Sequence, residues 1–245
     1  MKQTIINILR RTPLRYVYNR IKTTLVTTSQ SDESRILKRI AVNCPKTFVE
    51  VGFHPTEYNC IDLKEFKGLL VDGDKETVKL ANFLLSKRIE VLNMFVNLDN
   101  INTITDRFPQ LGVLSIDIDG NDYWILEALL PIGPHVIAVE YNASFGLNSV
   151  TVPYDPVFER HAKHSSGWYH GASIIALTKL CERYSYKLVA VASAGGNAFF
   201  VRTASGLPAL DPLTAYRENS LRNRWSKTTA SEQWARIKDM AYVTV

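Results

Sequence analysis

Short apolar runs alternate with stretches of helical periodicity through the middle of the chain. The run from Val113 to Ile118 is almost unbroken and contains two β-branched isoleucines, which is typical of a strand covered by helices on both faces. Beyond it, apolar residues between Trp124 and Leu129 recur at helical spacing. The same criteria predict strands at 47–52, 68–72, 89–94, 135–141, 186–192 and 197–202, and helices at 34–42, 76–85 and 171–184.

The order of these elements predicts an α/β fold. Strands that alternate with helices form a parallel sheet with right-handed crossovers. The link at 193–196 is too short for such a crossover, so the last two strands must be antiparallel. We predict a doubly wound, mostly parallel, seven-stranded Rossmann-like sheet with a terminal antiparallel hairpin in residues 46–205. A basic helical segment at 1–45 and a helical appendage at 206–245, anchored by Trp225 and Trp234, would flank it.

The predicted strands end at polar or acidic residues. After the strand at 113–118, Asp117, Asp119 and Asp122 crowd around Gly120 and Asn121. In open α/β sheets, ligands bind at the carboxyl ends of the strands. Asn121 or Asp122 could simply cap the following helix, but a cap needs one residue and not three carboxylates. We therefore interpret this stretch as part of a functional site.

Two other strand ends indicate a nucleoside ligand. Asp72 closes the second strand, where a carboxylate can accept hydrogen bonds from ribose hydroxyls. Gly52 ends the first strand and lets the backbone approach a ligand closely. The loop that follows lacks a Gly-x-Gly-x-Gly pattern, which argues against a dinucleotide pyrophosphate. S-adenosylmethionine (SAM) has no phosphate, so a site for it does not need the backbone N–H donors that a glycine-rich loop provides.

Six segments together resemble the FkbM-type family of class I, SAM-dependent methyltransferases, especially bacterial members encoded with surface-glycan genes. The string Ser-Ile-Asp-Ile-Asp-Gly-Asn-Asp-Tyr at 115–123 is the specific part, and the resemblance runs from about Ser29 to Arg202. The loop departs from the family pattern at His54-Pro55. The segments are Phe48–Gly52, Gly68–Asp74, Leu114–Tyr123, Val139–Asn142, Gly171–Ser173 and Asn197–Val201.

The resemblance implies SAM as the cofactor, with Glu50, Gly52 and Asp72 in contact with it and with Asp117 and Asp119 bordering the site of methyl transfer. We also assign Asn59, Asn97 and Asp117 to cofactor binding.

Methyl transfer to a hydroxyl group requires alignment of the acceptor and removal of its proton. The candidate bases are Asp117, Asp119 and His170. Alternatively, Asp117 or Asp119, together with Glu140, holds a divalent cation such as Mg²⁺, which would lower the pKa of the acceptor hydroxyl; we name Asp119 and Glu140 as the metal ligands. The acids are equally compatible with helix capping and SAM binding, so both alternatives stay open here.

The segment from 142 to 170, termed the lid below, interrupts the α/β pattern with five aromatic residues and three histidines. A connection of this length is usually functional. Its rings suit the apolar faces of a sugar. We expect His161 and His164 on a solvated helix face, and His170, next to the following helix, to be the better base.

Composition limits the alternatives. The 245 residues are 46% hydrophobic and 22% charged, as in ordinary soluble domains. The three scattered cysteines predict reduced thiols in a cytoplasmic protein. Residues 2–26 read as a basic amphipathic helix. It would pack on its own domain or on a second copy of the chain, giving a homo-oligomer, or lie on the inner face of a membrane.

The predicted function is transfer of a methyl group from SAM to a hydroxyl of a sugar or glycan precursor. The alternatives are methylation of a phosphorylated or nucleotide-linked small molecule and a non-catalytic scaffold in a glycan-assembly complex. Nucleic acid is not an expected partner, because the basic residues do not cluster with aromatic residues beside the strand ends.

Overall fold

The structure, a computed structural model, describes residues 29–85 and 87–245. The amphipathic helix predicted for residues 2–26 lies outside the described residues. Every helix in the described part of the chain is too short or too polar to cross a lipid bilayer. Cys44, Cys60 and Cys181 are free, as predicted.

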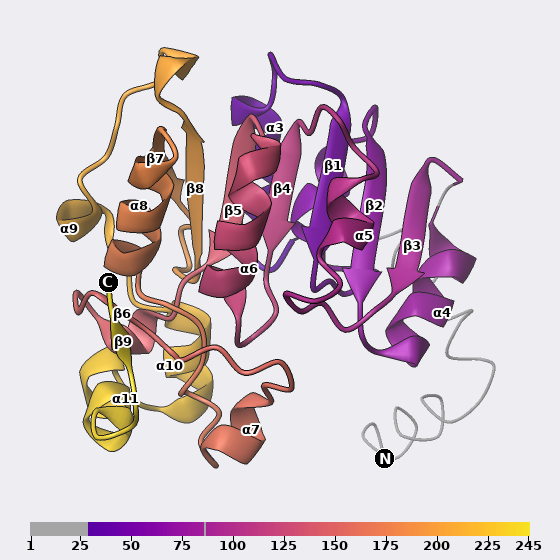
Figure 1. The fold of residues 1–245 in the computed structure, drawn as a ribbon. Coiled ribbons are helices and arrows are strands. Elements are labelled where there is room, and N and C mark those ends of the chain that lie inside the picture. The colour runs from indigo at the N-terminus through magenta and orange to yellow at the C-terminus, as the bar shows by residue number, and fades with distance from the viewer. Residues whose placement is uncertain (1–28, 86) are drawn as a thin grey trace.

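A seven-stranded sheet forms the centre of the molecule, in the order β3-β2-β1-β4-β5-β8-β7 (Figure 1). The first five strands in this order are parallel, and β8 runs antiparallel to both of its neighbours. This confirms the predicted Rossmann-like sheet with its terminal hairpin. The strands are β1 (Thr47–Val51), β2 (Lys67–Asp72), β3 (Ile89–Asn93), β4 (Val113–Ile116), β5 (Val136–Glu140), β7 (Tyr186–Val191) and β8 (Asn197–Arg202).

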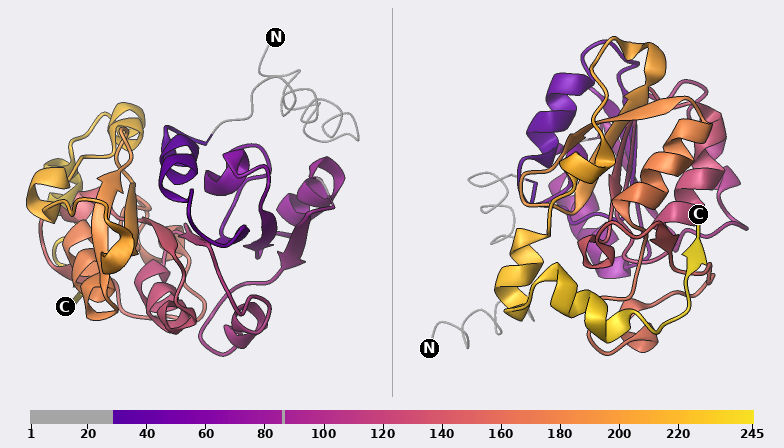
Figure 2. Two further views of the ribbon diagram at one scale, coloured as in Figure 1. Left: turned by 90° about the horizontal axis from the view of Figure 1, so that it is seen from above. Right: turned by 90° about the vertical axis from the view of Figure 1, so that its left-hand side faces the viewer.

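Helices cover both faces of this sheet. Seen from above (Figure 2, left), α3 (Glu33–Ile40) and α4 (Lys75–Leu84) lie on one side. On the other side are α5 (Asn102–Thr105), α6 (Asp122–Leu129) and α8 (Ile174–Arg183). Successive side chains of a strand point to opposite faces of the sheet. Phe48 therefore packs in the hydrophobic cluster that contains residues of α3, whereas Val49 packs in the cluster that contains residues of α6 and α8.

The register of the sheet places the predicted acids at one level. Val51 pairs with Val71 of β2 and with Ile116 of β4, and Ile116 pairs with Val139 of β5. The next residue on each strand therefore reaches the same edge. These residues are Gly52, Asp72, Asp117 and Glu140.

The lid and the C-terminal segment lie together beyond this edge (Figure 1). The lid contains η3 (Ala143–Phe145), β6 (Val150–Thr151) and α7 (Arg160–Lys163). β6 pairs with β9 (Val243–Thr244), a short strand near the C-terminus that the sequence did not predict. The remaining elements are η1 (Asn59–Asp62), η2 (Leu130–Ile132), η4 (Thr203–Ser205), α9 (Pro212–Ala215), α10 (Ser220–Ser226) and α11 (Ala230–Ile237).

Aromatic residues join the lid to the C-terminal segment. The ring of Phe145 lies 5.9 Å from that of Trp234 and 5.3 Å from that of Tyr242, centroid to centroid. Trp234 thus acts as an anchor, as predicted. The same prediction for Trp225 was wrong, because 87% of this residue is exposed. Trp234 is an anchor because it contacts Phe145 of the lid. Trp225 lies on the exposed side of α10.

Candidate active site

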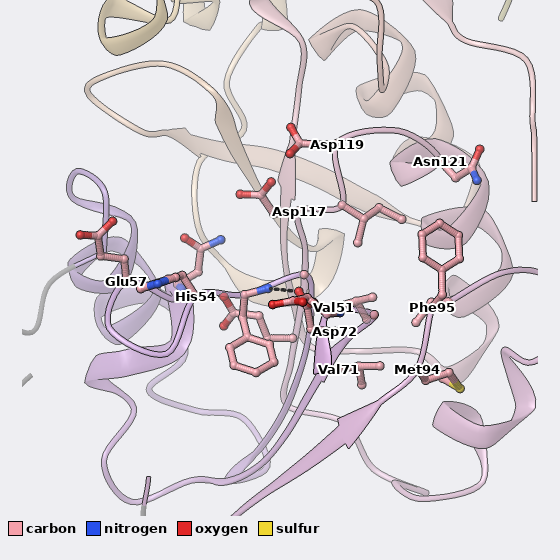
Figure 3. Close-up of a pocket in the computed structure, with 18 of the residues that line it drawn as sticks. Val51, His54, Glu57, Val71, Asp72, Met94, Phe95, Asp117, Asp119 and Asn121 are labelled. Atoms are coloured by element: carbon pink, nitrogen blue, oxygen red, sulfur yellow. Dashed lines mark hydrogen bonds between the residues drawn. The ribbon is translucent and has the colours of Figure 1, made fainter. Parts of the chain in front are cut away.

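A cavity of about 420 Å³ opens at the carboxyl ends of β1, β2 and β4 (Figure 3). The carboxylates of Asp72, Asp117 and Asp119 point into it, so acids from separate strands share one cleft. Asn97, Glu140 and His170 are not part of its lining. The predicted site residues that line it are Glu50, Gly52, Asn59, Asp72, Asp117 and Asp119.

Gly52 is required by the backbone of the protein itself. Its φ is +77°, and its N–H donates a hydrogen bond to the carbonyl of Val71 at 2.9 Å. A Cβ atom added here would lie 1.7 Å from the carbonyl oxygen of Asp117. The sequence indicated a glycine that admits a ligand, whereas the structure shows one that lets the ends of β1 and β4 meet.

Glu50 and Asn59 hold the loop that forms one wall of the cavity. The buried carboxylate of Glu50 accepts hydrogen bonds from the backbone N–H groups of Asn59, at 2.7 Å, and Cys60, at 2.9 Å. The side chain of Asn59 donates to Ser115 Oγ at 3.1 Å. Burial, which disfavours the charged form, raises the pKa of Glu50 to about 7. Glu50 therefore fixes the start of η1.

The raised pKa of Glu50 makes stability depend on pH. The folded protein binds this proton more tightly than the unfolded chain, because the pKa rises from 4.5 to about 7 on folding. Its stabilising contribution is complete below pH 4.5 and is lost as the pH rises through 7. We expect this one group to lower the free energy of unfolding by about 3 kcal/mol across that interval, measured by urea unfolding at a series of pH values.

The variant Glu50→Gln isolates this contribution. It should be less stable than the wild type at low pH, because an amide cannot accept both backbone hydrogen bonds. Its unfolding free energy should also fall less steeply between pH 4.5 and 7. Glu65→Gln, at an exposed position, should keep the wild-type slope. Equal slopes for the wild type and Glu50→Gln would contradict the assignment.

Asp72 retains acceptor capacity for a ligand. Its carboxylate accepts hydrogen bonds from the N–H groups of Asp74, at 2.7 Å, and Phe53, at 3.4 Å. An ionised carboxylate can accept about four hydrogen bonds, so further positions face the cavity. Burial raises the pKa of Asp72. Beside it, Phe95 lines the cavity with 54% of its surface exposed.

The three acids after β4 have different roles. Asp122 is buried and accepts hydrogen bonds from the N–H groups of Ile118 and Gly120, each at 2.9 Å, so it holds the loop. Asp117 and Asp119 line the cavity. Burial, together with the negative charges of Asp119 and Asp122, raises the pKa of Asp117 well above its usual value. The φ of Asp119 is +53°, a left-handed conformation that few residues other than glycine adopt.

Acidic side chains dominate the lining of the cavity, although the raised pKa values of Glu50 and Asp117 make its negative charge smaller than their number. Among the described residues that line it, six are carboxylates and none is Lys or Arg. A cleft lined by one sign of charge attracts ligands of the opposite sign. The lining therefore favours a cationic ligand over a phosphate. The six are Glu50, Glu57, Asp72, Asp74, Asp117 and Asp119.

Asp119 also belongs to a cluster with Glu140 and His170. The Nδ1 atom of His170 lies 3.7 Å from Glu140 Oε2 and 4.0 Å from Asp119 Oδ1. Potential ligand atoms of the three residues lie within 4.8 Å of one another. Burial raises the pKa of Glu140 well above its usual value and lowers that of His170. The predicted metal pair is thus brought together, with His170 as a third member.

Arg222, from α10, changes what this cluster can hold. Its guanidinium lies 3.0 Å from His170 Nε2 and 3.6 Å from Glu140 Oε1. Because a guanidinium only donates hydrogen bonds, Nε2 must accept and the proton of neutral His170 must lie on Nδ1. A protonated Nδ1 cannot coordinate a metal ion or accept a proton. The two predicted ligands already face guanidinium groups, Asp119 that of Arg160 and Glu140 that of Arg222. Together with this tautomer of His170, the arrangement disfavours a divalent cation, and it disfavours His170 as the base.

The lid is attached to the same loop. Arg160 of α7 forms an ion pair with Asp119, and Asn121 exchanges hydrogen bonds with the backbone of Asp155 at 2.7 and 3.3 Å. His161 is exposed, as expected. The lid aromatics Phe145, Phe158 and Tyr169 pack in the cluster beside α11, and of these three only Phe158 also lines the cavity.

Asn97 has a local role. Its side-chain oxygen accepts hydrogen bonds from the N–H groups of Asp99, at 3.0 Å, and Asn100, at 3.1 Å, so it stabilises a turn. Its predecessors Met94, Phe95 and Val96 line the cavity instead. Arg222 and Phe95 are the site residues that sequence reasoning missed. An apolar residue directly after a strand was the available signal for Phe95, and Arg222 had no such signal.

Comparisons with known proteins give structural likenesses only. No protein-family model matches the chain, and neither does any curated protein sequence. The N-terminal domain of EvdMO1, solved with bound SAH (S-adenosylhomocysteine), has a TM-score of 0.46 at 12% identity, covering 71% of this chain and 80% of that chain. For the methyltransferase domain of bacterial CtHen1-C, the TM-score is 0.43 at 19% identity, covering 70% of this chain and 98% of that chain. At such low values, function has to be argued from the chain's own site.

Proposed function

We propose that this protein is a SAM-dependent methyltransferase that acts on a hydroxyl group of a sugar or glycan precursor. The observation that carries the proposal is the cavity lined by acidic side chains at the carboxyl ends of β1, β2 and β4. Its position in the sheet is where open α/β folds bind ligands. The resemblance of several segments to FkbM-type methyltransferases supports the same cofactor and class of acceptor.

The residues of the cavity fit SAM. Asp72 would accept hydrogen bonds from the ribose hydroxyls, and the exposed ring of Phe95, with Met94 and Val96, would cover the adenine. The excess of carboxylates suits the positive charges of the sulfonium and amino groups. When bound, SAM supplies an electrophilic methyl group.

The residues of this chain would prepare the acceptor. Asp119 lines the cavity and also belongs to the cluster with Glu140 and His170. It would therefore lie between SAM bound in the cavity and an acceptor bound at the cluster. Asp119 would accept the hydroxyl proton of the acceptor. The methyl group would come from SAM, whose bond from sulfur to the methyl carbon breaks as the bond to the acceptor oxygen forms, leaving SAH. Asp117, which also lines the cavity, would offer a polar side chain beside the reacting groups.

Transfer of a labelled methyl group tests the activity. Purified protein is incubated with methyl-labelled SAM and a panel of nucleotide sugars and glycan precursors, and products are separated from SAM. Label in a methyl ether of a sugar is the expected result. Binding of SAH without transfer to any acceptor would favour the non-catalytic scaffold, and label in a phosphorylated small molecule without a sugar would overturn the acceptor class. Cytoplasmic location, contact with the membrane and homo-oligomer formation stay predictions.

Asp72→Ala is expected to weaken SAH binding by about 10- to 100-fold, because two hydrogen bonds from ribose hydroxyls to a carboxylate are lost. Isothermal titration calorimetry with SAH measures the change. Asp99→Ala is the matched control, since it removes the same charge from an exposed position in the loop after β3. Unchanged affinity in Asp72→Ala would refute the assigned role of this residue.

A further inference from the structure

We propose that Arg222 is the resident cation of the Asp119–Glu140–His170 cluster and that it holds His170 as a hydrogen-bond donor, through Nδ1–H, to the acceptor hydroxyl. This positioning role deepens the proposed function and rests on it. The C-terminal segment would thereby complete the acceptor side of the site without a divalent cation.

The guanidinium of Arg222 is held by several partners. One terminal nitrogen donates to Asn142 Oδ1 at 2.7 Å and to Ser144 Oγ at 3.2 Å. The other contacts His170 Nε2 at 3.0 Å and faces Glu140 at 3.6 Å. Only 15% of the side chain is exposed, so these contacts are largely protected from water. The charge therefore has a fixed place beside the cluster.

The backbone around Arg222 is fixed as well. Asn219 caps α10 by accepting a hydrogen bond from the N–H of Arg222 at 2.9 Å. The hydroxyl of Tyr141, directly after β5, donates to the carbonyl of Arg217 at 2.6 Å. The N–H of Ser220 donates to the carbonyl of Ala194 at 2.8 Å, in the turn between β7 and β8. The start of α10 and the segment before it are thus attached to the residue after β5 and to the turn between β7 and β8.

His170 has an unused donor that this arrangement explains. Its side chain is fully buried, and Nδ1 has no hydrogen-bond partner among the described residues. With Nε2 facing Arg222, Nδ1 carries the proton and points toward Asp119 and Glu140, which lie 3.7 to 4.0 Å away. A hydroxyl oxygen placed among them could accept from Nδ1–H and donate to a carboxylate. Such a group of donors and acceptors recognises an alcohol.

Binding of Mn²⁺ tests the position of the charge. In titrations followed by electron paramagnetic resonance, we expect Arg222→Ala to bind one Mn²⁺ ion at least tenfold more tightly than the wild type, because the cluster loses its cation and His170 can change tautomer. Addition of His170→Ala should abolish the gain, and Arg222→Lys, which keeps the charge, should not show it. Arg224→Ala, an exposed position on the same helix, is the control and should match the wild type. Equal affinity in Arg222→Ala and the wild type, or a wild-type Mn²⁺ site that His170→Ala removes, would overturn the proposal.

The tautomer of His170 can be measured without any variant. Long-range ¹⁵N–¹H correlation spectra of the wild type, assigned through the backbone, should show the proton of His170 on Nδ1. A proton on Nε2 would overturn the proposal even if Arg222→Ala failed to fold. Neither readout needs SAM or turnover. The proposed function fails separately, by absence of SAH binding and of methyl transfer.

Discussion

Asp119→Asn is expected to lower kcat by about 10²- to 10⁴-fold, the usual contribution of a general base, while SAH affinity changes little. Asn is the informative replacement because it tolerates the left-handed conformation, φ +53°, better than Ala. The variant therefore keeps the loop and removes the proton-accepting charge. Single-turnover transfer of labelled methyl groups, with calorimetry on SAH in parallel, separates chemistry from binding.

Arg160→Gln is the control for the lost ion pair. Asp119 pairs with Arg160 of the lid, so part of any loss in Asp119→Asn could come from a displaced α7. If Asp119 acts as the base, Arg160→Gln should retain most of the activity. An equal loss in both variants, or loss of SAH binding in Asp119→Asn, would assign Asp119 a structural role.

Gly52→Ala is expected to lower the free energy of unfolding by more than about 4 kcal/mol, a range reached by only a few kinds of substitution. The new Cβ would lie 1.7 Å from the carbonyl oxygen of Asp117, at the centre of the sheet edge, at a φ of +77°. The clash would be between the new Cβ and a backbone carbonyl oxygen, and neither atom can rotate away as a flexible side chain could. The ends of β1 and β4 would therefore have to move apart. Urea unfolding followed by circular dichroism measures the loss.

Gly206→Ala separates the clash from the backbone conformation. Gly206 has a nearly identical φ, +76°, but an added Cβ there would meet no atom within 4 Å. It should cost only the roughly 1–2 kcal/mol of a left-handed residue. Similar losses for the two variants would mean that the contact between Gly52 and Asp117 does not limit stability.

The sheet and its acidic edge could be predicted because their signals are local. Each apolar run marked a strand, and the residue that ended it, such as Asp72 or Asp117, had to lie at the common carboxyl edge of a parallel sheet. The division of labour among Asp117, Asp119 and Asp122 could not be predicted in the same way. It depends on which carboxylate accepts the hydrogen bonds of the backbone N–H groups in the loop at 118–120. A hydrophobic pattern does not predict the conformation of such a loop.

Features that depend on distant segments were missed. Arg222 lies in a short polar helix, and only folding brings it to His170, 52 residues earlier in the chain. The lid aromatics suggested a cover for a sugar, but Phe145 and Tyr169 pack in the cluster beside α11. An aromatic residue in a loop has the same sequence signal whether its partner is a ligand or another part of the chain.

The contacts of Arg222 also bear on how the protein matures during synthesis. The seven strands of the central sheet and the residues that line the cavity all precede Arg222 in the chain, and chains emerge from the ribosome with the N-terminal side first. A nascent chain could therefore form the cavity while His170 and Glu140 still lack the guanidinium of Arg222. Chemistry on an acceptor would become available only after translation has passed α10, when the helix docks against β5 and the turn between β7 and β8.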